Sequence, residues 1–133
     1  MVDLHVHTCY SLLDGMIKPE ELIDKIKEQG KTAICVTDHG HLYGNDKIYK
    51  LCKKNNIKYL HGCEVYVCDN VEEKSKENKY YHLILICINE TGRQNLNNIV
   101  SEAMLHKTES TLRLVRKKRK NRIPVHTTKS ASQ

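Results

Sequence analysis

The chain has neither tryptophan nor phenylalanine, so isoleucine, leucine, valine and tyrosine must fill its hydrophobic core. Its 133 residues suffice for one small domain with a real core. No apolar run approaches the roughly 20 residues of a membrane span. An N-terminal signal peptide is also not expected, because Asp3, His5 and His7 interrupt the apolar stretch there. We therefore expect a cytoplasmic protein with no membrane partner.

The sequence has six cysteines but no Cys-x-x-Cys pair, which argues against a zinc knuckle or a thioredoxin-like motif. Cys35 and Cys87 stand inside apolar runs, where a cysteine behaves as a small buried hydrophobe. Since cytoplasmic thiols are kept reduced, we expect no disulfide framework.

The net charge of +6 is concentrated at one end of the chain. Residues 1–103 contain 13 basic and 15 acidic side chains, a net charge of −2, whereas residues 104–133 contain 9 basic and 1 acidic, a net charge of +8. Residues 1–105 are therefore predicted to form the domain, and residues 106–133 a non-homologous and partly disordered tail. The tail carries the candidates for nonspecific DNA contacts: Arg113, Arg116, Lys117, Lys118, Arg119, Lys120 and Arg122. A solvated helix face or a translation artefact is the favoured alternative.

The pattern of apolar residues predicts an α/β fold. Strands are expected near residues 2–8, 32–37, 57–67 and 80–88, and helices near 19–30, 45–52 and 91–104, with a charged loop at 71–79. Pro19 favours the start of the first helix and Gly30 its end, and Asn45 or Asp46 can cap the second. This alternation predicts a parallel sheet or part of a (β/α) barrel, in which functional side chains gather at the C-terminal ends of the strands.

Two short segments at predicted strand ends carry metal-binding side chains: His5-Val6-His7-Thr8 and Thr37-Asp38-His39-Gly40. Because alternate strand residues point the same way, His5 and His7 can present two imidazoles together. His39 adds a third imidazole, and Asp38 is interpreted as a partner that orients a histidine. Nitrogen and oxygen ligands of this kind suit metals that drive hydrolysis.

Glu64 also falls at a strand end, whereas His82 lies near the start or middle of its strand and fits the pattern less well. His41, two residues after His39, is interpreted as a possible contact for a substrate phosphate rather than as a ligand. The remaining histidines are interpreted as non-ligands: His61, His106 and His126.

Several segments together resemble the PHP domain (polymerase and histidinol phosphatase). They are 4–8 (LHVHT), 10–15 (YSLLDG), 36–40 (VTDHG), 57–67 (IKYLHGCEVYV) and 81–85 (YHLIL), and the similarity runs in register over about residues 2–103. The paired histidines and the Asp-His motif would fit any PHP phosphoesterase. The Ser-Leu-Leu-Asp-Gly and Gly-Cys-Glu-Val-Tyr segments favour the branch at the N-terminus of bacterial C-family DNA polymerases, the polymerase III alpha subunits.

This resemblance implies a distorted (β/α)₇ barrel, of which the chain would supply about the first four strands with their helices. It implies up to three Zn²⁺, Mn²⁺ or Fe ions, whose ligands match His5, His7, Asp14, His39, Glu64 and His82. Glu64 would bridge two ions, and a metal-bound hydroxide would attack a phosphodiester. In the polymerase branch the domain is similar to a 3′–5′ exonuclease or is a structural relic. DNA and other polymerase III subunits are the implied partners.

The family barrel continues beyond the matched region and supplies a further cysteine or histidine and a late Asp-x-His pair, for which this sequence has no match. We therefore expect an N-terminal fragment, or a reading frame shifted near residue 103, that cannot polymerise DNA alone and has weak or no turnover. A stand-alone PHP phosphatase and a non-catalytic module that binds metal or DNA are the alternatives.

Overall fold

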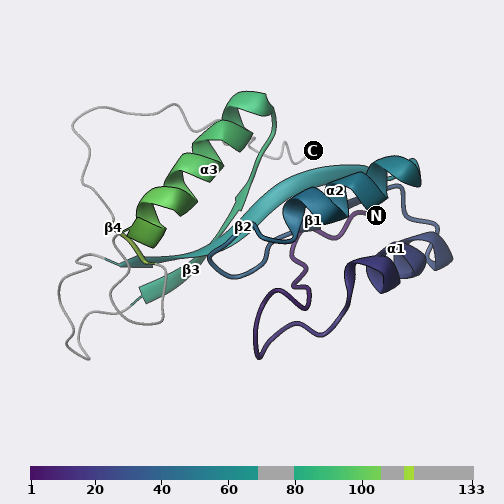
Figure 1. The fold of residues 1–133 in the computed structure, drawn as a ribbon, viewed down its shortest axis with the longest axis horizontal. Helices are drawn as coiled ribbons and strands as arrows, with labels where there is room; N and C mark the ends of the chain where they lie inside the picture. Colours follow the sequence, from purple (N-terminus) through teal and green to yellow (C-terminus); the bar gives the residue numbers. More distant parts are fainter. Residues whose placement is uncertain (69–79, 106–112, 116–133) are drawn as a thin grey trace, which may run out of the picture.

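The computed structural model describes residues 1–68, 80–105 and 113–115, which form three helices and four strands (Figure 1). In chain order they are α1 (Pro19–Glu28), β1 (Ala33–Val36), α2 (Asn45–Lys54), β2 (Lys58–Cys68), β3 (Tyr80–Ile86), α3 (Glu90–Leu105) and β4 (Arg113–Val115). Within these ranges, none of the helices combines the length and the apolar character needed to cross a bilayer. The mixed α/β class predicted from the sequence is confirmed.

The long strand β2 is the centre of the sheet. β1 pairs with its first half in parallel, β3 runs antiparallel along its second half, and β4 pairs in parallel with its last three residues. Figure 1 shows that α1 and α2 lie near one end of β2 and that α3 lies near its other end. The predicted parallel arrangement is therefore right for β1 and wrong for β3. Only residues 69–79 separate β2 from β3, fewer than the dozen or so that a parallel crossover needs.

The N-terminal segment, expected to be a strand over residues 2–8, is not one. It makes a single bridge, from Asp3 to Ile34, and the ladder is then interrupted where the backbone N–H of Val6 donates to the side-chain hydroxyl of Thr37 (3.2 Å). The segment still runs along β1, because the backbone N–H of Thr37 donates to the carbonyl of Val6 (2.9 Å). The histidines of this segment are thus held beside the sheet without belonging to it.

The three helices begin and end close to the predicted residues. Pro19 opens α1, and the chain turns out of it at Gly30, whose φ of 61° lies in the left-handed region that glycine tolerates. The predicted cap of α2 is wrong by one or two positions, since Gly44 occupies the N-cap. Asn45 is instead the first helical residue, and its side-chain oxygen accepts a hydrogen bond from the hydroxyl of Tyr59 (2.7 Å).

The hydrophobic core has two parts, and both lie on the helix-covered side of the sheet. One joins α1, α2 and β1, and its members are Leu22, Ile23, Ile26, Ile34, Val36, Ile48, Cys52 and Ile57. In the other, Cys63 and Val65 of β2 pack against α3. Since side chains alternate along a strand, Glu64 and Tyr66 point to the opposite face of β2. The helices therefore support one face, and the polar side chains gather on the other.

All six cysteines have free thiols. Cys35 is fully buried as predicted, whereas Cys87 is only half-buried. Burial raises the pKa of the Cys35 and Cys63 thiols to about 12. These two thiols are therefore protonated and unreactive at neutral pH, and the polar face must draw its chemistry from histidines and carboxylates.

Candidate metal centre

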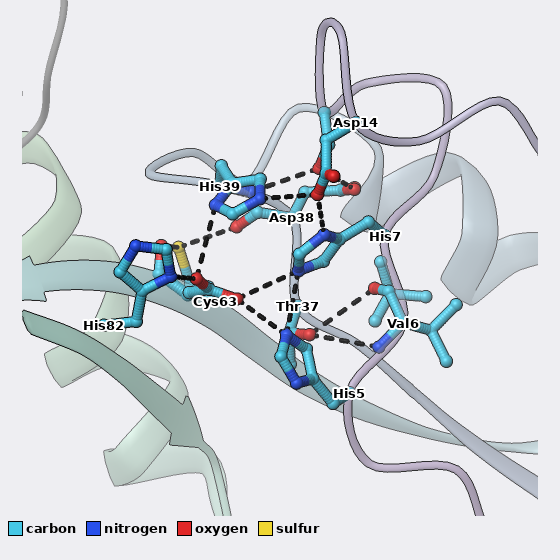
Figure 2. Close-up of polar contacts among 12 residues, drawn as sticks. His5, Val6, His7, Asp14, Thr37, Asp38, His39, Cys63 and His82 are labelled. Carbon is cyan, nitrogen blue, oxygen red and sulfur yellow. Dashed lines mark hydrogen bonds and ion pairs between the residues drawn. The ribbon is translucent and has the colours of Figure 1, made fainter.

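Four imidazoles, which are labelled in Figure 2, lie beside the carboxylate of Glu64, and this glutamate is 1% exposed. The Nε2 atoms of His5 and His7 lie 2.7 Å and 3.0 Å from its Oε2 atom. Its Oε1 atom faces His39, whose Nδ1 lies 3.5 Å away, and is contacted by Nδ1 of His82. Four of the predicted ligands therefore converge on the fifth, from three separate parts of the chain.

The sheet brings these parts together. The backbone N–H of Glu64 donates to the carbonyl of Asp38 (3.1 Å), and the N–H of Gly40 donates to the carbonyl of Glu64 (2.7 Å), so the chain after β1 stays beside β2. His82 lies opposite Tyr66 in the antiparallel pair. Because β3 runs antiparallel, its beginning lies beside the end of β2. This pairing explains why His82, near the start of β3, reaches Glu64, which a parallel β3 would not allow.

Asp14 joins the cluster from the loop before α1. Its Oδ2 atom lies 2.7 Å from Nε2 of His39 and also contacts Nδ1 of His7. His7 therefore uses one ring nitrogen toward Glu64 and the other toward Asp14. A neutral imidazole has one lone pair and one N–H, so His7 can bind a metal through one nitrogen while the other donates to a carboxylate.

The geometry fits a cation. The ring nitrogens of His5 and His7 lie 3.0 Å apart, and with Oε2 of Glu64 they form a compact triangle. Ligands about 2.1 Å from one ion would be separated by roughly 3.0–3.4 Å, close to the spacings found. The buried Oε1 atom of Glu64 has no hydrogen-bond partner within the described residues, although His82 is within ion-pair distance. This oxygen therefore has lone pairs available to bind a metal.

The two carboxylates are anionic at neutral pH. Burial by itself would raise the pKa of Glu64, but hydrogen bonds from His5 and His7 and the charge of His39 more than offset it, so that this pKa is lowered. Hydrogen bonds from His39 and His7 lower the pKa of Asp14. Anionic oxygens beside imidazole nitrogens are a donor set that suits divalent metal ions.

Asp38, predicted to orient a histidine, instead holds the loop that follows His7. Its buried carboxylate accepts hydrogen bonds from the backbone N–H of Thr8 (2.7 Å), the hydroxyl of Thr8 (2.8 Å) and the hydroxyl of Ser11 (2.7 Å). The Ser11 oxygen in turn accepts from the backbone N–H of His39 (3.2 Å). Asp38 therefore acts on the backbone that carries the ligands, and sequence reasoning missed Thr8 and Ser11.

Sequence reasoning also missed Tyr66. Its hydroxyl lies 3.2 Å from Nδ1 of His39, and the two rings stack with centroids 6.0 Å apart. The Tyr66 ring meets that of His82 edge to face, with centroids 4.6 Å apart. The available signal was its spacing, since a residue two places after Glu64 on a strand shares the same face. Tyr66 thus fixes the rotation of one imidazole and borders another.

Replacing Tyr66 with phenylalanine is expected to weaken zinc binding about 10-fold, because partners of metal ligands typically contribute 10- to 100-fold in affinity. The ring contacts remain and only the hydroxyl at His39 is lost. Competition with a chromophoric chelator measures the affinity. Tyr49→Phe, a tyrosine of α2 outside the centre, is the matched control. Equal affinities for the two variants would show that the hydroxyl does not matter.

The other histidines lie away from Glu64 or outside the described residues. Nε2 of His41 donates to the carbonyl of Tyr10 (2.9 Å), and His61 packs against Tyr59. Burial, with a smaller contribution from Arg93, lowers the pKa of His61. His106 and His126 lie outside the described residues, as do the tail residues 116–122; of the predicted DNA contacts, only Arg113 falls in a described element, β4, which was not predicted.

The chain matches the PHP domain family over residues 3–127. It is 40% identical over 108 residues to the DNA polymerase III subunit alpha of Treponema pallidum, covering 78% of this chain and 9% of that protein. It is 44% identical over 104 residues to the protein of the same name from Aquifex aeolicus, covering 71% and 9%. The chain therefore spans about a tenth of the length of these relatives.

Two solved structures share the fold. An amidohydrolase from Chromobacterium violaceum superposes with a TM-score of 0.52 at 25% identity, covering 79% of this chain and 34% of that one. A protein assigned as a metal-dependent phosphoesterase, from Bifidobacterium adolescentis, superposes with a TM-score of 0.53 at 22% identity, covering 81% and 35%. Both proteins are about three times as long as the region they share with this chain.

Proposed function

This chain belongs to the PHP domain family, and on that premise we propose that its polar centre hydrolyses phosphodiesters with bound divalent metal ions. The observation that carries the proposal is the buried carboxylate of Glu64, which four histidines contact while one of its oxygens lacks a hydrogen-bond partner within the described residues. Four histidines around one buried carboxylate add little to the stability of the fold unless they and the carboxylate bind the same cation.

His5, His7 and Glu64 are the residues we assign to one ion. Asp14 and His39, which form a second triad with His7, are assigned to another. His82, whose Nδ1 contacts the second oxygen of Glu64, would be a further ligand on that side of the carboxylate. A bound divalent ion supplies Lewis acidity toward a phosphoryl group and makes water more acidic. The donor set suits Zn²⁺, Mn²⁺ or Fe rather than an ion that requires oxygen ligands alone.

The surrounding residues orient the centre and leave it open to solvent on one side. The side chains of His5, Asp14 and His82 are each more than half exposed, whereas that of Glu64 is buried. The exposed side is where a phosphodiester can approach, and Asp38 holds the backbone of this rim in place through Thr8. The charged groups are thus arranged before substrate arrives, as electrostatic catalysis requires.

The similarity to polymerase III alpha subunits supports DNA as the substrate. We propose a 3′–5′ exonuclease as the reaction, which is what the family resemblance implies. We propose that the chain corresponds to the N-terminal PHP part of such a subunit and forms part of its barrel, with the other polymerase subunits as its partners. Because the chain covers only 9% of the length of these relatives, we propose that it does not polymerise DNA alone.

The test is an assay of the 133-residue protein with Mn²⁺ and a single-stranded oligonucleotide labelled at its 3′ end. We expect slow release of the label, at least tenfold faster with Mn²⁺ than with EDTA, and its loss in His7→Ala. His61→Gln, a histidine outside the centre, is expected to keep the wild-type rate. Metal binding without any cleavage would indicate a non-catalytic metal-binding module instead.

A further inference from the structure

Three large apolar side chains project into solvent at the rim of the metal centre. Leu12, Leu13 and Met16 are 86%, 108% and 92% exposed, and we call them the apolar ridge. They flank Asp14, whose carboxylate contacts His7 and His39. Consecutive Cα atoms are about 3.8 Å apart, so the ridge begins one residue from a group at the centre.

The ridge stands on a backbone that is held firmly. The N–H groups of Asp14 and Gly15 both donate to the carbonyl of Ser11 (3.1 Å and 2.8 Å), and Ser11 is itself fixed by Asp38. A Cβ atom added at Gly15 would lie 2.0 Å from the carbonyl oxygen of Thr8, so the loop is pressed against the chain that carries His7. The exposed side chains are therefore presented by an ordered turn.

Leu13 has a φ of 67°, in the left-handed region. For a bulky side chain this conformation is an outlier that costs on the order of 1–3 kcal/mol, and such strain clusters at binding sites. Burial does not explain it, because the Leu13 side chain makes no core contact and is fully exposed. The cost is understandable if the side chain has a binding role.

We propose that the apolar ridge binds the nucleobase of the nucleotide whose phosphate lies at the metal centre. This inference rests on the proposed function and specifies its substrate class: phosphodiesters that carry a base. The three ridge residues carry no charge, and the neighbouring Asp14 is an anion that would repel a second phosphate, so the ridge suits a flat apolar ring. Leucine and methionine are side chains that proteins insert against base steps, and contacts with the face of a base tolerate any sequence.

The charge of residues 1–103 supports contact with a single base beside the metal centre and not with a long stretch of nucleic acid. Residues 1–103 carry a net charge of −2 and so offer little electrostatic attraction to a long polyanion. The affinity that residues 1–103 themselves contribute toward a nucleic acid end must then come from the metal centre and from the adjacent base, apart from any contribution of the basic tail. A protein segment covering the same ridge is the rival interpretation, and the experiment separates the two.

The experiment measures binding of two probes to the Mn²⁺-loaded, 133-residue protein by ³¹P relaxation. One probe is a thymidine dinucleotide with a hydrolysis-resistant phosphorothioate linkage, and the other is dimethyl phosphate, a phosphodiester without bases. We expect the dinucleotide to bind at least tenfold more tightly. The double variant Leu12→Ser, Met16→Ser should lose that tenfold advantage while its affinities for dimethyl phosphate and Mn²⁺ stay unchanged. Leu13→Asn, which tolerates the left-handed conformation, should show part of the same loss.

The control is Ile88→Ser, an equally exposed apolar residue outside the centre, which should behave as wild type toward both probes. Loss of the dinucleotide advantage in the ridge variants alone supports the proposal. If the ridge variants keep it, or if wild type binds both probes equally, the ridge proposal fails while the metal centre stands. If wild type binds neither probe, the proposed function fails and the ridge proposal fails with it. A change in sedimentation of the ridge variants with no change in probe binding would assign the ridge to a protein contact and overturn the proposal.

Discussion

Replacing Glu64 with glutamine is expected to lower the affinity for Zn²⁺ by at least about 100-fold, since even the outer partners of metal ligands account for 10- to 100-fold. The substitution keeps the size of the side chain but removes the charge that His5, His7 and His82 contact. It also replaces one of the two carboxylate oxygens with an amide that cannot bind a cation. Both oxygens face imidazoles, so either orientation of the amide disrupts the centre.

Thermal unfolding gives a second measurement of the same loss. A ligand that binds only the folded state raises the free energy of unfolding by RT ln(1 + [L]/Kd), which is about 2.7 kcal/mol at a ligand concentration of 100 Kd. Added Zn²⁺ should therefore raise the Tm of the wild type and leave that of Glu64→Gln almost unchanged. The matched control is Glu28→Gln, an exposed glutamate of α1 paired with Lys25, for which the Zn²⁺-dependent rise should persist. A similar rise in both variants would remove Glu64 from the centre.

Local sequence patterns predicted that several members of the centre would lie together, although residues 2–8 form no regular strand. His5 and His7 were expected to point together, and both contact Glu64. The alternation that directs Glu64 to one face of β2 also places Tyr66 there, so the same reasoning could have identified Tyr66. The convergence of these side chains is confirmed, and their role as ligands stays a prediction.

What could not be predicted depends on contacts between distant segments. Asp14 lies in an ordinary Asp-Gly turn by local criteria and was expected at the centre only from the family resemblance. Its contact with His39 depends on how the loop folds back, which the buried Asp38 controls. His82 was judged out of place because a parallel β3 was assumed, and pairing direction is a tertiary property that local patterns fix poorly.

Asp38 is expected to matter through the number of its hydrogen bonds and less through its charge. Asp38→Ala should destabilise the fold by about 3–5 kcal/mol, since bonds to a charged acceptor contribute about 1.5–3 kcal/mol each and the buried donors of Thr8 and Ser11 would lose their partner. Asp38→Asn should cost only about 1–2 kcal/mol. Its amide oxygen can keep the bonds from the Thr8 N–H and the Ser11 hydroxyl, while its NH₂ group can donate to the Thr8 oxygen.

The two variants separate a structural carboxylate from a metal ligand. If Asp38 only supports the loop, Asp38→Asn binds Zn²⁺ within a few-fold of wild type, and Asp38→Ala loses both stability and affinity. Urea unfolding of the metal-free proteins and zinc competition on the folded ones measure the two effects, with exposed Asp24→Ala in α1 as the control. Loss of zinc binding in Asp38→Asn without loss of stability would instead make Asp38 a ligand. The structure argues against that outcome, because both of its oxygens are already occupied by Thr8 and Ser11.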